Sequence, residues 1–268
     1  MEVRKMSKLK SLKLWSKVIL GLSILCLLYI VYALIGVRLE MMSAREASGY
    51  IRRAVQIGIF LMGGGLLVAI LGRKNPDAIK RGFAAIIILL IPLLVIKTNM
   101  PAGTAIFAKS GPPPKVAGAS PSKPRSGPMP LNDISTDTTN PPQFVAVIAQ
   151  HKKRTNSPDY PGPKAAKTQK KLYPDIAPIQ SNLSKSEAFK RAKSLAESQG
   201  WDIIAADENS GIIEAVVTTF FLRYQDDVVI RVQGSADKSV IDIRSHSRIG
   251  RSDRGKNAER IRKFIKKF

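Results

Sequence analysis

The sequence predicts an α+β protein in which three N-terminal transmembrane helices precede a Pro-rich tether and a two-layer C-terminal domain. Three observations support this prediction: long uncharged apolar runs early in the chain, a stretch dense in proline, and alternating helix and strand patterns near the end. They divide the chain into a membrane domain at 1–108, a tether at 109–129 and an α+β domain at 130–268. The composition of the tether favours extended, solvated chain.

Three apolar runs are predicted to cross a membrane, at about 18–37, 54–72 and 82–96. The first two are uncharged and, at about 1.5 Å per residue, match the thickness of the hydrocarbon core. The third is shorter and contains Pro92, so its crossing depends on Lys80, Arg81 and Lys97, which can snorkel from its ends, and on an uncharged continuation. In the second run the pairs Ala54/Gly58 and Gly65/Ala69 indicate either close helix packing or a loosely packed glycine-rich helix.

The basic residues that flank these runs predict the orientation of the chain. With the N-terminus inside, the cytoplasmic flanks hold Arg4, Lys5, Lys8, Lys10, Lys13, Lys17, Arg73, Lys74, Lys80 and Arg81. The opposite flanks hold Arg38, Arg45, Arg52, Arg53 and Lys97. Because basic flanks prefer the cytoplasm, we expect a cytoplasmic N-terminus. Three spans then place the C-terminal domain outside the cytoplasm, as in an integral protein of the bacterial inner membrane.

The net charge of +23 suggests nucleic-acid binding until its distribution is considered. Residues 1–100 contribute +11, residues 101–171 contribute +8, and residues 172–268 contribute only +4. Most of the charge therefore flanks apolar helices or lies in the tether, and no nucleic-acid partner is expected. With one cysteine, Cys26, and two histidines, no metal site is expected. The P-loop and dinucleotide motifs are absent, and no cofactor is predicted.

The C-terminal domain shows two helical patterns around four strand patterns. An amphipathic helix at 186–199, begun by Ser184 or Ser186 and ended by Gly200, precedes strands at 201–206, 211–221, 226–233 and 239–247. A second helix begins at about Asp253. Short connections favour a four-stranded antiparallel meander with both helices on one face. The lysine-rich segment 149–171 is predicted to be a solvated insertion.

Strand alternation places apolar side chains on one face of this sheet and charged ones on the other. The charged face, with the turn and helix that follow it, provides a candidate polar cluster: Glu214, Asp227, Arg231, Asp242, Arg244, Arg248, Asp253, Asn257 and Arg260. We expect Arg231 and Arg244 to pair with Glu214, Asp227 or Asp242, since an unpaired buried charge is costly. Such a face is either a self-neutralising structural network or the site of an enzyme.

Other motifs have ordinary structural explanations. In Ser245-His246-Ser247 neighbouring side chains point to opposite faces, so these residues cannot form a catalytic triad. Asp226 and Asp227 are split between faces for the same reason. In the turn 248–257 we expect Asp253 or Ser252 to cap the last helix, although the same N–H groups with Arg248 or Arg251 could bind an anion. Asx-turns explain the polar residues Asn132, Asp133 and Asp137 better than a cation site does.

Several blocks of the C-terminal half resemble a known family. They include PLNDISTDTTNPPQF at 130–144, DDVVIR at 226–231, RSHSRIG at 244–250 and SDxGxNAxRI at 252–261. In this order they are similar to the family catalogued as domain of unknown function 1499. The resemblance implies that 130–144 belongs to the domain and that membrane spans at the N-terminus are common among members. It implies no activity, because none is established for the family.

These observations together predict a membrane-tethered, extracytoplasmic binding or assembly module of the cell envelope. Its expected partners are the lipid bilayer and either an anionic envelope lipid or glycan or another protein. The alternative is an envelope enzyme that uses the charged face of the sheet.

Overall fold

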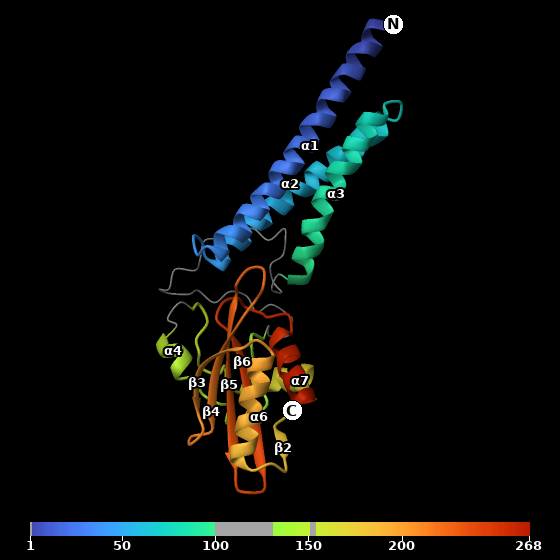
Figure 1. Ribbon diagram of the computed structural model, residues 1–268. Coiled ribbons are helices and arrows are strands. Elements are labelled where there is room, and N and C mark those ends of the chain that lie inside the picture. The colour runs from blue at the N-terminus through green and yellow to red at the C-terminus, as the bar shows by residue number, and fades with distance from the viewer. Residues whose placement is uncertain (1, 100–130, 151–153) are drawn as a thin grey trace, which may run out of the picture. The chain divides into compact units, whose positions relative to one another are not determined.

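The computed structural model describes residues 2–99, 131–150 and 154–268, which form two compact units (Figure 1). The N-terminal unit consists of long helices, and the C-terminal unit combines a sheet with shorter helices. The predicted tether at 109–129 lies outside the described residues.

Three helices form the N-terminal unit: α1 (Glu2–Arg38), α2 (Ala44–Leu71) and α3 (Pro76–Asn99). Within them, Lys10–Arg38 and Ala44–Leu71 are long and apolar enough to cross a membrane. The third predicted span, 82–96, lies inside α3, which contains Pro92, and its crossing stays a prediction.

The small residues of α2 allow its neighbours to approach closely. A Cβ atom on Gly65 would lie 2.9 Å from the carbonyl oxygen of Gly82 in α3, which is closer than real Cβ atoms come. The Cys26 thiol of α1 lies 3.1 Å from the carbonyl oxygen of Ala54 in α2. The glycine-rich pattern therefore serves close helix packing, which was one of the two interpretations that the sequence left open.

The C-terminal unit contains one antiparallel sheet in the order β1-β6-β5-β4-β3, with β2 also paired to β6. The meander of β3 (Asp202–Asp207), β4 (Ile212–Thr218), β5 (Gln225–Gly234) and β6 (Ser239–Ser247) follows the prediction. The predicted strand count is wrong, because β1 (Asp133–Ser135) and β2 (Ile179–Ser181) both pair with β6. Strands of three residues are too short to show alternation in a sequence.

The helices α6 (Lys185–Ser198) and α7 (Lys256–Lys267) cover one face of the sheet, as predicted (Figure 1). Ser184 begins α6 in a capping box with Glu187, and Gly200 follows its end with a φ of +75°. The main core lies between these helices and the sheet. Its buried residues include Phe189, Ala192, Trp201, Ile230, Ile243, Ile261 and Phe264.

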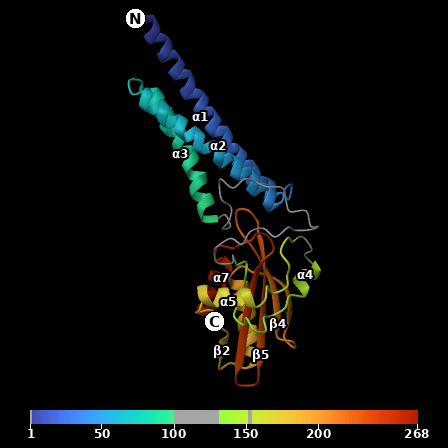
Figure 2. The ribbon, with the colours of Figure 1, turned by 180° about the vertical axis from the view of Figure 1, so that it is seen from behind.

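The opposite face is covered by the chain that precedes α6 (Figure 2). Phe144, just before the short helix α4 (Ala146–Gln150), and Val147 within it pack against Val216 and Val229 of the sheet. The next helix, α5 (Pro163–Leu172), instead contributes Ala165 to the main core. Its buried Gln169 bonds the N–H and the carbonyl oxygen of Ser135 in the edge strand β1. Within 149–171 the lysines of α5 are exposed, while Ala165 and Gln169 are buried, and the solvated insertion stays a prediction.

We predict that the C-terminal unit folds without the N-terminal helices, because its main core consists of residues of this unit alone. A fragment of residues 128–268 should be soluble and monomeric and should unfold in one cooperative thermal transition. Size-exclusion chromatography with light scattering and calorimetry would measure this. Aggregation, or a broad transition, would mean that the membrane helices are part of the fold.

Candidate functional site

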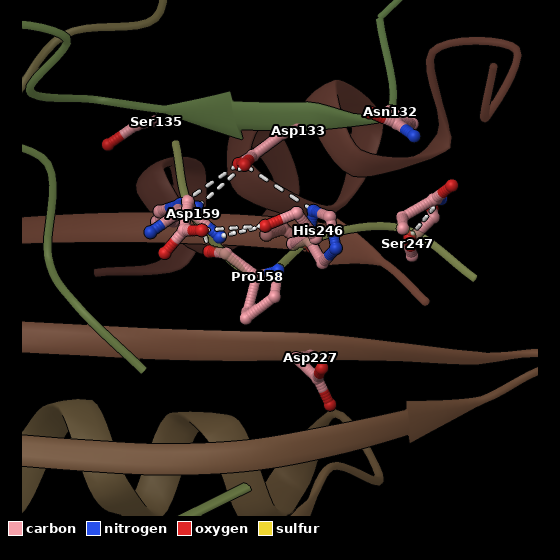
Figure 3. A network of polar contacts seen from close by, with 12 residues as sticks. Asn132, Asp133, Ser135, Pro158, Asp159, Asp227, His246 and Ser247 are labelled. Carbon is pink, nitrogen blue, oxygen red and sulfur yellow. Dashed lines mark hydrogen bonds and ion pairs between the residues drawn. The ribbon is translucent and has the colours of Figure 1, made fainter. Parts of the chain in front are cut away.

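Charged side chains gather on the face of the sheet that points away from α6 and α7. His246 on β6 lies opposite Asp133 on β1 and opposite Asp227 on β5. Directly opposed residues share a face, so the imidazole lies between two carboxylates, as Figure 3 shows. All three residues are buried, with exposed fractions of 1 % or less. The alternation predicted for β5 and β6 is thus confirmed.

Arg244, two residues before His246, is the largest fully buried side chain among the described residues. Its Nε and Nη2 atoms donate to the two carboxylate oxygens of Asp133 at 3.0 and 2.7 Å. Its remaining hydrogen bonds go to the carbonyl oxygens of Pro142 and Pro158, at 3.1 and 2.6 Å. The rings of Phe144 and Tyr160 lie 4.7 and 5.4 Å from the guanidinium carbon. This combination of a bidentate ion pair with aromatic contacts suits arginine and no other side chain.

Asp227 is a second buried carboxylate and pairs with two arginines. Its Oδ1 lies 2.7 Å from Nε of Arg248, which follows β6. Its Oδ2 lies 2.8 Å from Nη1 of Arg154. Arg154 belongs to the segment that covers this face, described at 142–150 and 154–158, which we call the covering segment. The carboxylate is fully shielded from solvent, so these contacts replace its hydration.

The other acids on this face are also engaged. Asp242 accepts from Arg231 at 2.8 Å and from the Thr136 hydroxyl at 3.1 Å. Glu214 accepts four hydrogen bonds of 3.0 Å from the backbone N–H groups of residues 145–147. Glu214 therefore stabilises the N–H groups at the start of α4 and does not pair with an arginine. The acids of this face thus hold the covering segment in place.

The predicted pairs are partly confirmed. Arg231 pairs with Asp242, as expected, and also with Asp137 at 3.1 Å. The prediction that Arg244 pairs with Glu214, Asp227 or Asp242 is wrong, because its partner is Asp133. Asp133 belongs to a strand that alternation could not reveal, and Arg154 to a segment that looked solvated. The only signal in the sequence was the block at 130–144, which indicated that this segment belongs to the domain.

The nine residues of the candidate polar cluster do not form one site. Asp253, Asn257 and Arg260 lie on the helical side of the sheet. Asp253 accepts the backbone N–H of Asn257 at 2.7 Å and so stabilises the first turn of α7, but the N-cap itself is Gly255 and not the predicted Asp253 or Ser252. Asn257 accepts from the Ser245 hydroxyl at 2.8 Å, and Arg260 binds Asp226 at 2.7 Å. These contacts join α7 to the ends of β5 and β6.

The geometry also answers the question of catalytic motifs. Ser245 points to the helical side and His246 to the opposite side, so the histidine cannot activate that serine. Among the described residues, no group of three His, Cys, Asp or Glu side chains could hold a metal ion. The three polar residues considered for a cation have protein partners: Asn132 donates to Gly250, Asp133 binds Arg244, and Asp137 binds Arg231.

Three groups around these clusters have shifted pKa values. Burial, with the negative charge of Asp133, raises the pKa of Tyr160 to about 12. Burial also raises the pKa of Asp253, against the effect of its hydrogen bonds from Asn257 and Gly255. Burial acts to raise the pKa of Asp137 as well, but bonds from Asn140, Thr139 and Arg231 outweigh it and lower this pKa. The Asp137 carboxylate is thus expected to be ionised at neutral pH.

We predict that replacing Arg244 by Met strongly destabilises the domain, because it leaves the Asp133 carboxylate buried without its partner. The expected loss is about 3–5 kcal/mol of unfolding free energy. The matched control is Arg262→Met, since Arg262 pairs with Asp175 on the surface and both side chains are about half exposed. Its expected cost is at most about 1 kcal/mol. Chemical denaturation of both variants measures the difference, and equal costs would contradict the buried pair.

Comparison with known proteins supports the family resemblance. The family model described as "Protein of unknown function (DUF1499)" matches residues 133–268. No curated protein matches the chain. The matched segment starts at the first residue of β1 and contains every strand of the described sheet. The C-terminal α+β domain is therefore the family domain, and the chain belongs to the DUF1499 family of proteins of unknown function.

Proposed function

We propose that this protein is a membrane-anchored binding or assembly module of the cell envelope, with its α+β domain on the extracytoplasmic side of the membrane. Two helices that are long and apolar enough to cross a bilayer support the anchoring. The distribution of basic residues around them supports the orientation.

One observation favours a module over an enzyme: the charged face of the sheet is internally neutralised and buried. Arg244 and Asp227 have an exposed fraction of 0 %, and each is satisfied by charged partners. A catalytic acid or base must come within hydrogen-bond distance of its substrate. The acids of this face instead bind arginines and backbone N–H groups of the covering segment. The exposed surface of the domain is therefore left for the function.

His246 supports the alternative of an envelope enzyme. Its ring is buried between two carboxylates, with Nδ1 3.4 Å from Asp133. Within the described part of the chain, neither ring nitrogen has a hydrogen-bond partner. Such a histidine is unusual in a purely structural network, because buried polar atoms are normally hydrogen-bonded.

Chemical modification distinguishes the two functions. If the charged face is a sealed network, diethyl pyrocarbonate should leave His246 unmodified in the folded chain and modify it after denaturation. Mass spectrometry of the peptides separates His246 from the other histidine, His151. Modification of His246 in the folded chain would show that small molecules reach this face, and it would favour the enzyme.

The proposed orientation predicts the activity of reporter fusions. Alkaline phosphatase, which is active only outside the cytoplasm, should be active when fused after Phe268 and inactive when fused after Asn75. The reason is that the chain crosses the membrane three times before Phe268 but only twice before Asn75, which lies between the second and third predicted spans. Two inactive fusions would mean that 82–96 does not cross and that the domain is cytoplasmic. Activity only after Asn75 would mean that the orientation is inverted.

A further inference from the structure

The helix α5 carries a row of lysines on its outer side. Ala165 and Gln169 are its buried residues, and they face the domain. At 3.6 residues per turn, the opposite side of the helix holds four exposed lysines: Lys164, Lys167, Lys170 and Lys171. No acidic residue lies within α5. The helix therefore presents four positive charges to the solvent and no negative one.

The second half of α7 continues this positive surface. Lys263, Lys266 and Lys267 are exposed on the side of α7 that points away from the core. Tyr173, which directly follows α5, joins the two helices, because its ring lies 5.2 Å from the guanidinium carbon of Arg262 in α7. Figure 2 shows the two helices next to each other. We call these seven lysines, four on α5 and three on α7, the lysine face.

The lysine face has no acidic partner within the domain. Among the described residues of the C-terminal unit, none of its seven side chains forms an ion pair. Two exposed acids nearby are already paired, Asp175 with Arg262 and Glu259 with Lys256, and a third, Asp159, precedes α5. The residues outside the described ranges contain neither Asp nor Glu. The positive charge of this face is therefore not neutralised by the chain itself.

This arrangement works against the stability of α5. Its N-cap, Gly162, provides no side-chain hydrogen bond, and Lys164 places a positive charge in the first turn, where the helix dipole disfavours it. Lys167 lies three and four residues before Lys170 and Lys171, so like charges repel along one side of the helix. Basic residues in a last turn favour a helix, which explains Lys170 and Lys171 but neither of the first two lysines. Residues that oppose local folding are expected where a function requires them.

The chemistry of the lysine face suits an anionic lipid surface. Lysines act as point charges and lack the planar fork with which arginine binds a single phosphate, so a cluster of them fits many headgroups without a defined geometry. The aromatic residues beside the face, Tyr173 and Phe268, are only partly exposed and lie against Arg262 and Arg191. They are therefore not available for the base stacking that single-stranded nucleic acids require. The same chain carries helices that are long and apolar enough to cross a bilayer.

We propose that the lysine face binds the anionic phospholipid headgroups of the membrane in which the chain is anchored. This inference deepens the proposed binding function and rests on the proposed anchoring. The anchor keeps the domain at a high effective concentration near the bilayer, so a weak electrostatic contact is sufficient. Added salt should release the domain, because salt screens exposed charges.

Energy transfer in nanodiscs tests the binding on the full chain. In a Trp15→Phe background, Leu172→Trp places a donor at the end of α5, where Leu172 is 45 % exposed. The nanodiscs contain phosphatidylcholine, with or without phosphatidylglycerol, and a trace of dansyl-labelled phosphatidylethanolamine as acceptor. A chain without the added tryptophan gives the contribution of the buried Trp201, which is subtracted. Transfer from position 172 should be high with phosphatidylglycerol, fall with added salt, and be low in phosphatidylcholine alone.

Charge reversal on α5 tests whether the lysines carry the binding. The variant Lys164→Glu/Lys167→Glu should lower the ratio of bound to unbound domain at least about 25-fold, because each lysine near an anionic surface contributes about fivefold. The matched control, Lys190→Glu/Lys238→Glu, makes the same change in net charge on α6 and in the β5–β6 turn, where both lysines are exposed. It should keep the transfer. An equal loss in both variants would show an effect of net charge alone and would overturn the proposal.

Two further measurements exclude a purely structural role. The variant Lys164→Glu/Lys167→Glu should keep or raise the melting temperature of the chain, measured by circular dichroism, because it places an acid in the first turn of α5. A lower melting temperature together with lost transfer would assign these lysines to folding and contradict the proposal. On α7, Lys263→Glu/Lys266→Glu should reduce the transfer as well. Unchanged transfer in this variant would overturn a surface formed by both helices.

A probe in α1 separates failure of binding from failure of anchoring. Leu28→Trp replaces a side chain that is 56 % exposed, and its transfer should be high in both kinds of nanodisc. High transfer at position 28, with equal transfer at position 172 in both lipid mixtures, would overturn the binding and keep the anchor. No transfer at either position would overturn the anchor as well. If soluble polyglutamate, and not phosphatidylglycerol, changes the emission at position 172 in a lysine-dependent way, the face binds an acidic protein and the proposal is wrong.

Discussion

The arrangement of the C-terminal domain depends on one buried guanidinium group. Arg244 binds the carboxylate of Asp133 with two hydrogen bonds and also donates to the carbonyl oxygens of Pro142 and Pro158. These partners come from β1 and from two stretches of the segment that covers the sheet. One side chain on β6 therefore holds three separate parts of the chain against the same face. Without it, little apolar surface would keep this segment in place, since the core on this side is small.

Other buried charges of the sheet also hold the covering segment in place. Asp227 holds Arg154, and Glu214 accepts the N–H groups at the start of α4. Burying such groups is costly, and they persist only when every charge has a partner. A paired network of this kind selects one position for the covering segment, because any shift would leave a buried charge alone. The charges on this face are thus best explained by positioning. Among the described residues of this face, the ring nitrogens of His246 and the hydroxyl of Tyr160 are buried without a hydrogen-bond partner.

The two faces of the sheet have different roles. The helical face carries the main apolar core, and the opposite face carries the ionic network. Among the described residues, most side chains of β5 and β6 are buried on both faces. Contacts with partners are therefore left to the exposed surfaces of the domain.

Local patterns in the sequence were sufficient for the long elements. The apolar spacing of α6 and α7 and the alternation of β4, β5 and β6 depend on residues close together in the chain, and the predicted positions agree with the structure within a few residues. The cap at Ser184 was predictable for the same reason, whereas the N-cap of α7 is Gly255. The sequence also determined which residues of β5 and β6 share a face, because alternation is a property of the strand itself.

Only the tertiary structure decided which charges meet. The pairing of Arg244 with Asp133 joins residues more than a hundred positions apart, through a strand of three residues that has no pattern of its own. The same applies to Arg154, whose lysine-rich surroundings resemble solvated chain until the covering segment is seen against the sheet. Phe220 and Phe221 have high strand propensity, yet they lie in a turn, because the register of β4 with β5 places the end of the hairpin there. Strand register and the path of a covering segment arise from contacts between distant parts of the chain, and no local pattern encodes them.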